Sequence, residues 1–168
     1  MPARPAPKRT RGVVLSGLLL TLALAVLAVL AGCGPTEVAT PPAADRAACA
    51  ALVEDLPDRL AGEERVEVEP AAYGAGWGDP AITLSCGVGA PDGFGPASSC
   101  LDADGVDWFG PDEQTQDNGS DVTLTTVTMR PRVAVHFPAT YRGGPLAAAL
   151  SDLAPALKRG LRVGTPCQ

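Results

Sequence analysis

The sequence has 168 residues, which is enough for one ordinary domain and few for two. Lys and Arg number 13 against 19 Asp and Glu, and the net charge of -6 argues against a nucleic-acid partner, because such proteins need a basic face. Hydrophobic residues make up 46% of the chain but aromatic residues only 4%, so we expect one small domain with a thin core.

The N-terminal 32 residues have the pattern of a secretion signal. Four basic residues and no acidic residue precede an almost unbroken apolar run over residues 13–30, which is the form of a signal peptide. Leu-Ala-Gly-Cys at residues 30–33 resembles a bacterial lipobox. We therefore predict that residues 1–32 are removed and that Cys33 carries a diacylglycerol, with its freed amine acylated as well. The alternative is a signal retained as a membrane anchor.

Both alternatives place the remaining chain on the outer face of the cell membrane, because the basic residues stay inside. The membrane is then a predicted partner, bound through the acyl anchor. Without residues 1–32 the chain keeps nine basic and 19 acidic side chains, a net charge of -10, so anionic headgroups repel it. Residues 33–44 are predicted to be the lipidated Cys and a flexible Pro-rich tether of up to about 30 Å. Residues 45–168 are then a single extracytoplasmic domain.

A helix is predicted at the start of this domain. Apolar residues recur at helical spacing between Asp45, a potential N-cap, and Pro57, where the helix ends. Residues 65–69 and 82–88 alternate between apolar and polar residues and predict two half-buried strands. The Gly-rich segment 71–80 between them is expected to be a loop.

The second half of the domain is predicted to contain three more strands and a helix. A short strand is expected near residues 106–108, and segment 110–120, which has no apolar residue, is expected to be an exposed, mobile loop. Residues 122–129 predict a bulged strand and residues 133–137 a regular one. A helix is expected from Pro145 onward, with Gly160 just past its end. This order predicts an α+β fold, with a mostly antiparallel sheet of about five strands flanked by an N-terminal and a C-terminal helix.

Four cysteines remain once Cys33 is assigned to the lipid. An even number in an oxidising compartment predicts two structural disulfides, and no Cys-x-x-Cys pair or Cys/His cluster points to redox chemistry or a metal. Three connectivities are possible. We favour Cys86–Cys100, which would close a Gly/Pro loop beside a strand, and Cys49–Cys167, which would tie the first helix to the chain end.

The segment Tyr-Gly-Ala-Gly-Trp-Gly-Asp-Pro over residues 73–80 is the most distinctive stretch of the domain. Tyr73 and Trp77 can stack on a sugar ring or a peptide with Asp79 as hydrogen-bond acceptor, or they can pack at the end of a sheet. Arg130 either pairs with a carboxylate or meets an anion. These four residues are the candidates for ligand binding, with a purely structural role as the alternative.

No catalytic motif is evident. The nucleophile elbow, the zinc-protease motif, Ser-x-x-Lys and the spacings of phosphate and dinucleotide loops are all absent, so no catalytic residue and no cofactor is predicted. His136, the single His, is expected on the outward face of its strand; with Asp79 and Asp107 it is the candidate for hydrolase or transferase chemistry. An acidic stretch begins at Asp102, but the fifth position of a calcium loop counted from there is Val106, so no metal site is predicted. Weak calcium binding is the alternative to solvated acids.

Several segments together are similar to a known family. Between a lipobox and a terminal helix, they are the Cys-bearing helix ending in Asp-Leu-Pro (49–57), Trp-Gly-Asp-Pro-Ala-Ile-Thr-Leu-Ser-Cys-Gly-Val (77–88), Gly-Val-Asp-Trp (105–108) and Met-Arg-Pro-Arg-Val-Ala-Val (129–135). This set resembles domain of unknown function 3515, a family of small secreted actinobacterial lipoproteins, over about residues 45–165. The chain has Ser85 where that family often has Arg, and Met129 where it often has Gly. The family has no assigned activity, so the resemblance implies location and fold.

Three functions remain open on these observations. The first is a non-enzymatic binding or assembly module of the bacterial envelope, which meets an envelope protein or a wall polymer through the 73–79 loop or the 110–120 loop. The second is a solute- or glycan-binding domain that uses Trp77. The third is an envelope hydrolase or transferase. The acyl anchor, the disulfides and the lack of a catalytic motif favour the first.

Overall fold

The computed structural model describes residues 34–164 and residue 167. All described helices and strands belong to one compact unit, residues 35–168. The predicted signal peptide, residues 1–32, and the predicted lipidation site Cys33 lie outside the described residues. Within the described ranges, no helix has the length and apolar character needed to cross a bilayer.

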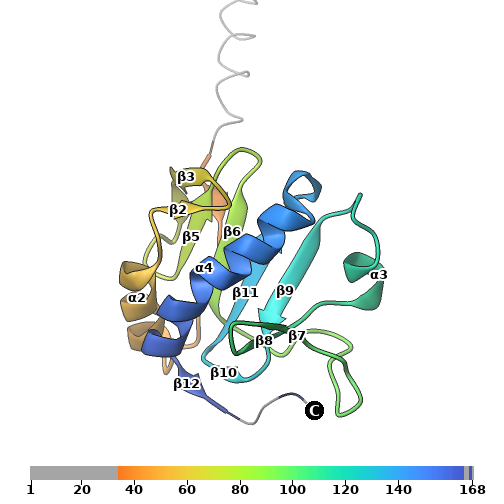
Figure 1. The fold of residues 1–168 in the computed structure, drawn as a ribbon. Coiled ribbons are helices and arrows are strands. Elements are labelled where there is room, and N and C mark those ends of the chain that lie inside the picture. Colours follow the sequence, from red (N-terminus) through yellow and green to blue (C-terminus); the bar gives the residue numbers. More distant parts are fainter. Residues whose placement is uncertain (1–33, 165–166, 168) are drawn as a thin grey trace, which may run out of the picture. The chain divides into compact units, whose positions relative to one another are not determined.

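An antiparallel sheet of eight strands forms the centre of the domain (Figure 1). Every neighbouring pair in it is antiparallel, which confirms the predicted α+β class, while the number of strands exceeds the predicted five. In spatial order the strands are β2 (Arg59–Leu60), β3 (Glu63–Val66), β5 (Gly74–Trp77), β6 (Ile82–Val88), β11 (Arg132–Phe137), β9 (Val122–Thr126), β8 (Val106–Phe109) and β7 (Leu101–Ala103).

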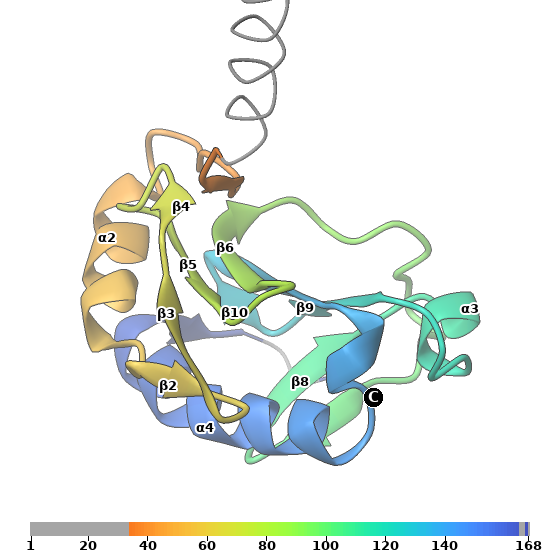
Figure 2. The same ribbon diagram turned by 90° about the horizontal axis from the view of Figure 1, so that it is seen from above.

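Two helices cover one face of the sheet, as the two turned views show (Figures 1 and 2). They are α2 (Arg46–Asp55) and α4 (Gly144–Gly160), which correspond to the two predicted helices. Leucines of both helices are buried against alternate residues of the central strands, and this alternation puts the remaining strand residues on the opposite face. A short helix, α3 (Asp112–Thr115), and a 3-10 turn, η2 (Ala139–Tyr141), lie outside this layer.

The Gly-rich segment 71–80 contains a buried strand where a loop is expected. A Cβ at Gly74 would lie 2.3 Å from the Leu84 carbonyl oxygen, and one at Gly76 would lie 2.8 Å from a Val68 methyl group. Only glycine allows neighbouring chains to approach so closely. The glycines that suggested a loop therefore mark close packing around β5.

Two expected strands are each divided into two. The predicted strand over 65–69 is split between β3 and β4 (Val68–Glu69), and that over 122–129 between β9 and β10 (Met129–Arg130). The second part of each leaves the main sheet: β4 pairs with β1 (Thr36–Glu37), and β10 pairs with β12 (Arg162–Val163). The chain changes partners at these breaks.

Part of the segment 33–44, which is expected to be a flexible tether, is attached to the domain beside β4. Residues 36 and 37 pair in parallel with β4, and Val38 is buried. The part of residues 33–44 that remains outside the domain is therefore much shorter than the sequence suggested.

The two disulfides join Cys49 to Cys86 and Cys100 to Cys167. The predicted presence of two disulfides is confirmed, but the favoured pairing is wrong. Cys86 lies in β6, and Cys100 directly precedes β7, four strand positions away in the sheet. At about 4.8 Å per strand this is about 19 Å, far more than a disulfide can join. Cys49 instead faces β6 from α2, where its side chain is fully buried.

Candidate functional site

Trp77 is part of the core and has no exposed surface. Its indole Nε1 donates a hydrogen bond of 3.0 Å to the Pro57 carbonyl, and the Arg65 guanidinium stacks over its ring at 5.2 Å. Burial lowers the pKa of Arg65, and the nearby Asp58 carboxylate partly offsets this effect. No face of the indole reaches solvent in this structure, so the packed, structural alternative describes the position of Trp77.

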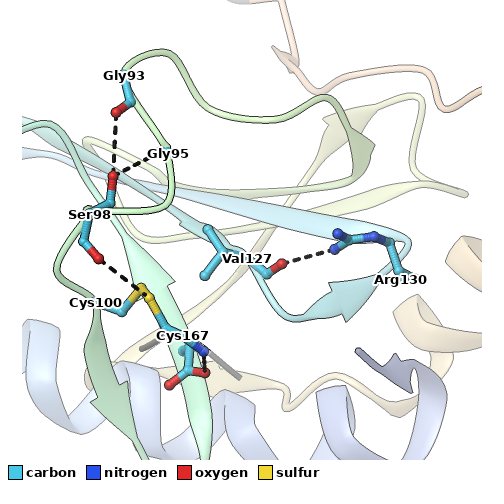
Figure 3. The surroundings of a disulfide bond; sticks show 8 residues. Gly93, Gly95, Ser98, Cys100, Val127, Arg130 and Cys167 are labelled. Atoms are coloured by element: carbon cyan, nitrogen blue, oxygen red, sulfur yellow. Dashed lines mark hydrogen bonds between the residues drawn. A yellow bond between two sulfur atoms is a disulfide. The ribbon is translucent and has the colours of Figure 1, made fainter. Parts of the chain in front are cut away.

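The other three ligand candidates do not assemble around Trp77. Tyr73 is half-buried against the core. Asp79 is exposed next to Tyr141, and burial, with the Glu63 and Asp79 carboxylates, raises the pKa of the Tyr141 phenol. Arg130 turns back on its own chain and donates to the carbonyl of Val127 (Figure 3) and to that of Met129. These contacts are local, so neither an anion nor a carboxylate partner is needed to explain Arg130.

His136 lies on the sheet face opposite the helices, as predicted. Its Nδ1 is 3.2 Å from the Thr123 hydroxyl, and its Nε2 is 3.5 Å from a carboxylate oxygen of Asp121. The other Asp121 oxygen accepts the backbone N–H of Ala139. Sequence reasoning missed both partners, although the alternation of β9 and β11 places Thr123 and His136 on the same face. Asp107 accepts the backbone N–H of Cys167 instead, so it is not part of this cluster.

A surface groove with a volume of about 640 Å³ lies between the loop that precedes β7 and the start of α3. Glycine, proline, alanine and serine residues form most of its lining, and the Phe109 ring adds an apolar surface. Phe109 is itself held by an edge-to-face contact with Phe94, with ring centres 5.3 Å apart. The lining residues are Asp92, Gly93, Gly95, Pro96, Ala97, Ser98, Ser99, Phe109, Pro111, Asp112 and Glu113.

The loop wall of this groove, residues 92–99, is internally braced. The Ser98 hydroxyl accepts the N–H of Gly95 at 2.9 Å and donates to the Gly93 carbonyl at 3.4 Å (Figure 3). The disulfide between Cys100 and Cys167 fixes the end of this wall, and the Cys167 sulfur lies 3.7 Å from the Ser98 carbonyl oxygen. The wall is therefore preformed, which lowers the entropy lost on binding.

The charged side chains of the groove are all acidic. Asp92, Asp112 and Glu113 are exposed, and none of the ion pairs among the described residues includes them. No group of three metal-ligating side chains lies together in the described part of the chain. The lining combines the Phe109 ring and two prolines with three exposed carboxylates, which favours a partner that carries positive charge.

The opposite wall belongs to the segment 110–120, which was expected to be exposed and mobile. It is exposed, but Arg142 holds its backbone. The two terminal nitrogens of Arg142 donate to the carbonyls of residues 114, 115 and 120 and to the Asn118 side chain, at 2.8–3.3 Å. A segment without apolar residues is thus ordered by a guanidinium more than twenty residues away, which no local pattern reveals.

Replacing Arg142 with Met is expected to accelerate amide hydrogen exchange over residues 112–120 about tenfold or more, because four hydrogen bonds to this segment are lost. Exchange measured by mass spectrometry on the full chain tests this. Arg159→Met is the matched control, since Arg159 makes only an exposed ion pair with Asp55. Equal exchange in both variants would show that Arg142 does not order the segment.

A comparison with known protein families identifies the family of this chain. The family model of DUF3515, described as a protein of unknown function, matches residues 13–162. The chain belongs to this family. No curated protein and no solved structure matches the chain. DUF3515 membership agrees with the resemblance seen in the sequence, and it assigns neither a reaction nor a ligand.

Proposed function

We propose that this DUF3515 protein is a lipid-anchored, non-enzymatic binding module on the outer face of the cell membrane, and that its acidic groove receives a positively charged, extended segment of an envelope protein. The groove is the single observation on which this proposal depends. It joins an internally braced backbone wall, the apolar Phe109 ring and three carboxylates that form no ion pair with any described residue. The lipobox at residues 30–33 supports the anchor.

An extended peptide suits this groove better than a sugar does. The lining includes Phe109 and two prolines, and its exposed carboxylates can pair with Lys or Arg side chains. The alternative of glycan binding depended on Trp77 as a stacking platform, and its complete burial removes that surface. The groove also includes the start of the 110–120 loop, one of the two segments expected to meet a partner.

A labelled decapeptide of alternating Lys and Ala tests the groove by fluorescence anisotropy. The combined variant D92N/D112N/E113Q is expected to bind it about tenfold more weakly, since three exposed charge pairs together contribute about 1–2 kcal/mol. The control variant E54Q/D104N/D152N neutralises three exposed acids elsewhere and makes the net charge less negative by the same three charges. It should bind as the unmodified protein does.

Two results would contradict this assignment. Equal weakening in both triple variants would mean that the peptide senses only the overall negative charge. Equal affinity for a Glu-Ala decapeptide would mean that the groove does not select positive charge. Far-UV circular dichroism of each variant verifies that the fold is retained.

A further inference from the structure

Residues 36–41, which we call the N-terminal strap, are bound to the domain by backbone hydrogen bonds. Strand β1 pairs in parallel with β4 and brings Thr36 opposite Val68. The N–H of Val38 donates to the Glu69 carbonyl at 2.8 Å, and the N–H of Ala39 donates to the Ser85 hydroxyl at 3.0 Å. The strap therefore bridges β4 and β6, two strands that are not neighbours (Figure 2).

Two side chains of the strap pack in the space that two glycines leave open. Val38 is only 8% exposed and packs on Gly74, where a Cβ would lie 2.8 Å from the Val38 Cγ2 atom. Pro41 is buried over Gly87, where a Cβ would lie 2.3 Å from the Pro41 Cβ atom. Backbone pairing and side-chain burial at both positions indicate a specific seat, because a loosely associated tether would need neither.

Further contacts fix the position of Pro41 on Gly87. A Cβ on Gly87 would lie 3.4 Å from the Cys49 sulfur, so the disulfide between Cys49 and Cys86 packs directly under this position. Arg46, in the first turn of α2, donates to the Pro41 carbonyl at 3.5 Å. The strap is thus attached next to one of the two disulfides of the domain.

We infer that the strap holds the domain directly against the membrane surface and so restricts its partner to one at that surface. This inference depends on the proposed lipid anchor at Cys33. Three residues of chain from Cys33 to Thr36 span at most about 10 Å, whereas a free tether to residue 44 would span three to four times as much. The partner is then the outer segment of a membrane-embedded protein.

The short covalent link from the acylated Cys33 to the strap keeps the domain at the membrane, because the strap itself offers no attraction to anionic lipid. Glu37 and Glu69 are opposite each other in the pair of β1 and β4, and both are exposed. Their carboxylates repel anionic headgroups. The height of the domain above the bilayer should therefore be insensitive to the anionic lipid content, which separates a short tether from adsorption.

Energy transfer on liposomes measures this height. The lipidated full chain, with a fluorescent amino acid at the exposed position 72, is reconstituted with acceptor-labelled headgroups. Ten Gly/Ser residues inserted between Gly34 and Pro35 should lower the transfer, since they add about 17 Å of mean length. The variant Val38→Asp/Pro41→Ser should lower it as well by releasing the strap. Thr40→Ser, at an exposed position of the strap, is the control and should match the unmodified protein.

Equal transfer in the unmodified, inserted and released forms would overturn the inference. A second measurement does not require the lipid: amides of Val38 and Ala39 in the full chain should exchange at least a hundredfold more slowly than in Val38→Asp/Pro41→Ser. Rapid exchange in the unmodified chain would also overturn it. Failure of the lipid anchor is distinguishable, because intact mass would then show no acyl chains although the strap amides remained protected.

Discussion

Replacing Trp77 with Ala is expected to lower the free energy of unfolding by about 3–5 kcal/mol, the range measured for large aromatic truncations in cores. The indole is fully buried, so its loss leaves a cavity that the backbone of β5 cannot fill. The Pro57 carbonyl also loses its donor, and the Arg65 guanidinium loses the ring on which it stacks. Urea denaturation followed by far-UV circular dichroism measures the change.

Trp77→Phe keeps the measurement informative if Trp77→Ala does not fold. Phe retains most of the apolar contact and loses the indole hydrogen bond, so a cost of about 1–2 kcal/mol is expected. Leu101→Ala is the matched control at a side chain that is 49% exposed, and it should cost less than about 1 kcal/mol. If Trp77→Ala cost no more than Leu101→Ala, Trp77 would not be a core residue, and a role in ligand binding would be open again.

Removal of the disulfide between Cys49 and Cys86, by changing both residues to Ala, is expected to cost about 4 kcal/mol. The two cysteines are 37 positions apart, and closing a loop of that length restricts the unfolded chain by about this free energy. Both side chains are fully buried, so lost packing adds to the cost. Denaturation midpoints with and without the disulfide measure it.

The matching variant for the second disulfide changes Cys100 and Cys167 to Ala. Its loop is longer, since the cysteines are 67 positions apart, but both residues are only half-buried, so a similar total of about 4 kcal/mol is expected. Mass spectrometry of a non-reduced digest identifies the pairs directly. A peptide that links Cys86 to Cys100 would contradict the connectivity and the order of the strands between them.

Elements with a regular apolar period could be predicted from the sequence. The leucine faces of α2 and α4 and the alternation of β6 and β11 appear in the fold at nearly the predicted positions. Strand β5 could not be predicted, because Gly-Ala-Gly-Trp lacks alternation and is fixed by neighbours that pack closely against it. The short edge strands have too few residues to show any period.

The candidate site was less predictable than the fold. Trp77 stood out because aromatics among glycines suit both a binding loop and a packed strand, and only the neighbours of β5 distinguish the two. The groove depends on residues 92–99 and 109–113, which the chain separates and the second disulfide helps to place. Its loop wall contains glycine, serine and proline, whose backbone contacts leave no sequence pattern.

Photo-crosslinking in living cells tests the proposed function most directly. A photoreactive amino acid is placed in the lipidated full chain at Ala97, which lines the groove, or at Ala147, which is exposed on α4. We predict a discrete crosslinked species with a membrane-embedded protein from position 97, weakened in D92N/D112N/E113Q and missing from position 147. Equal crosslinking from both positions, or none at position 97 in folded, acylated protein, would contradict a binding module that works through this groove.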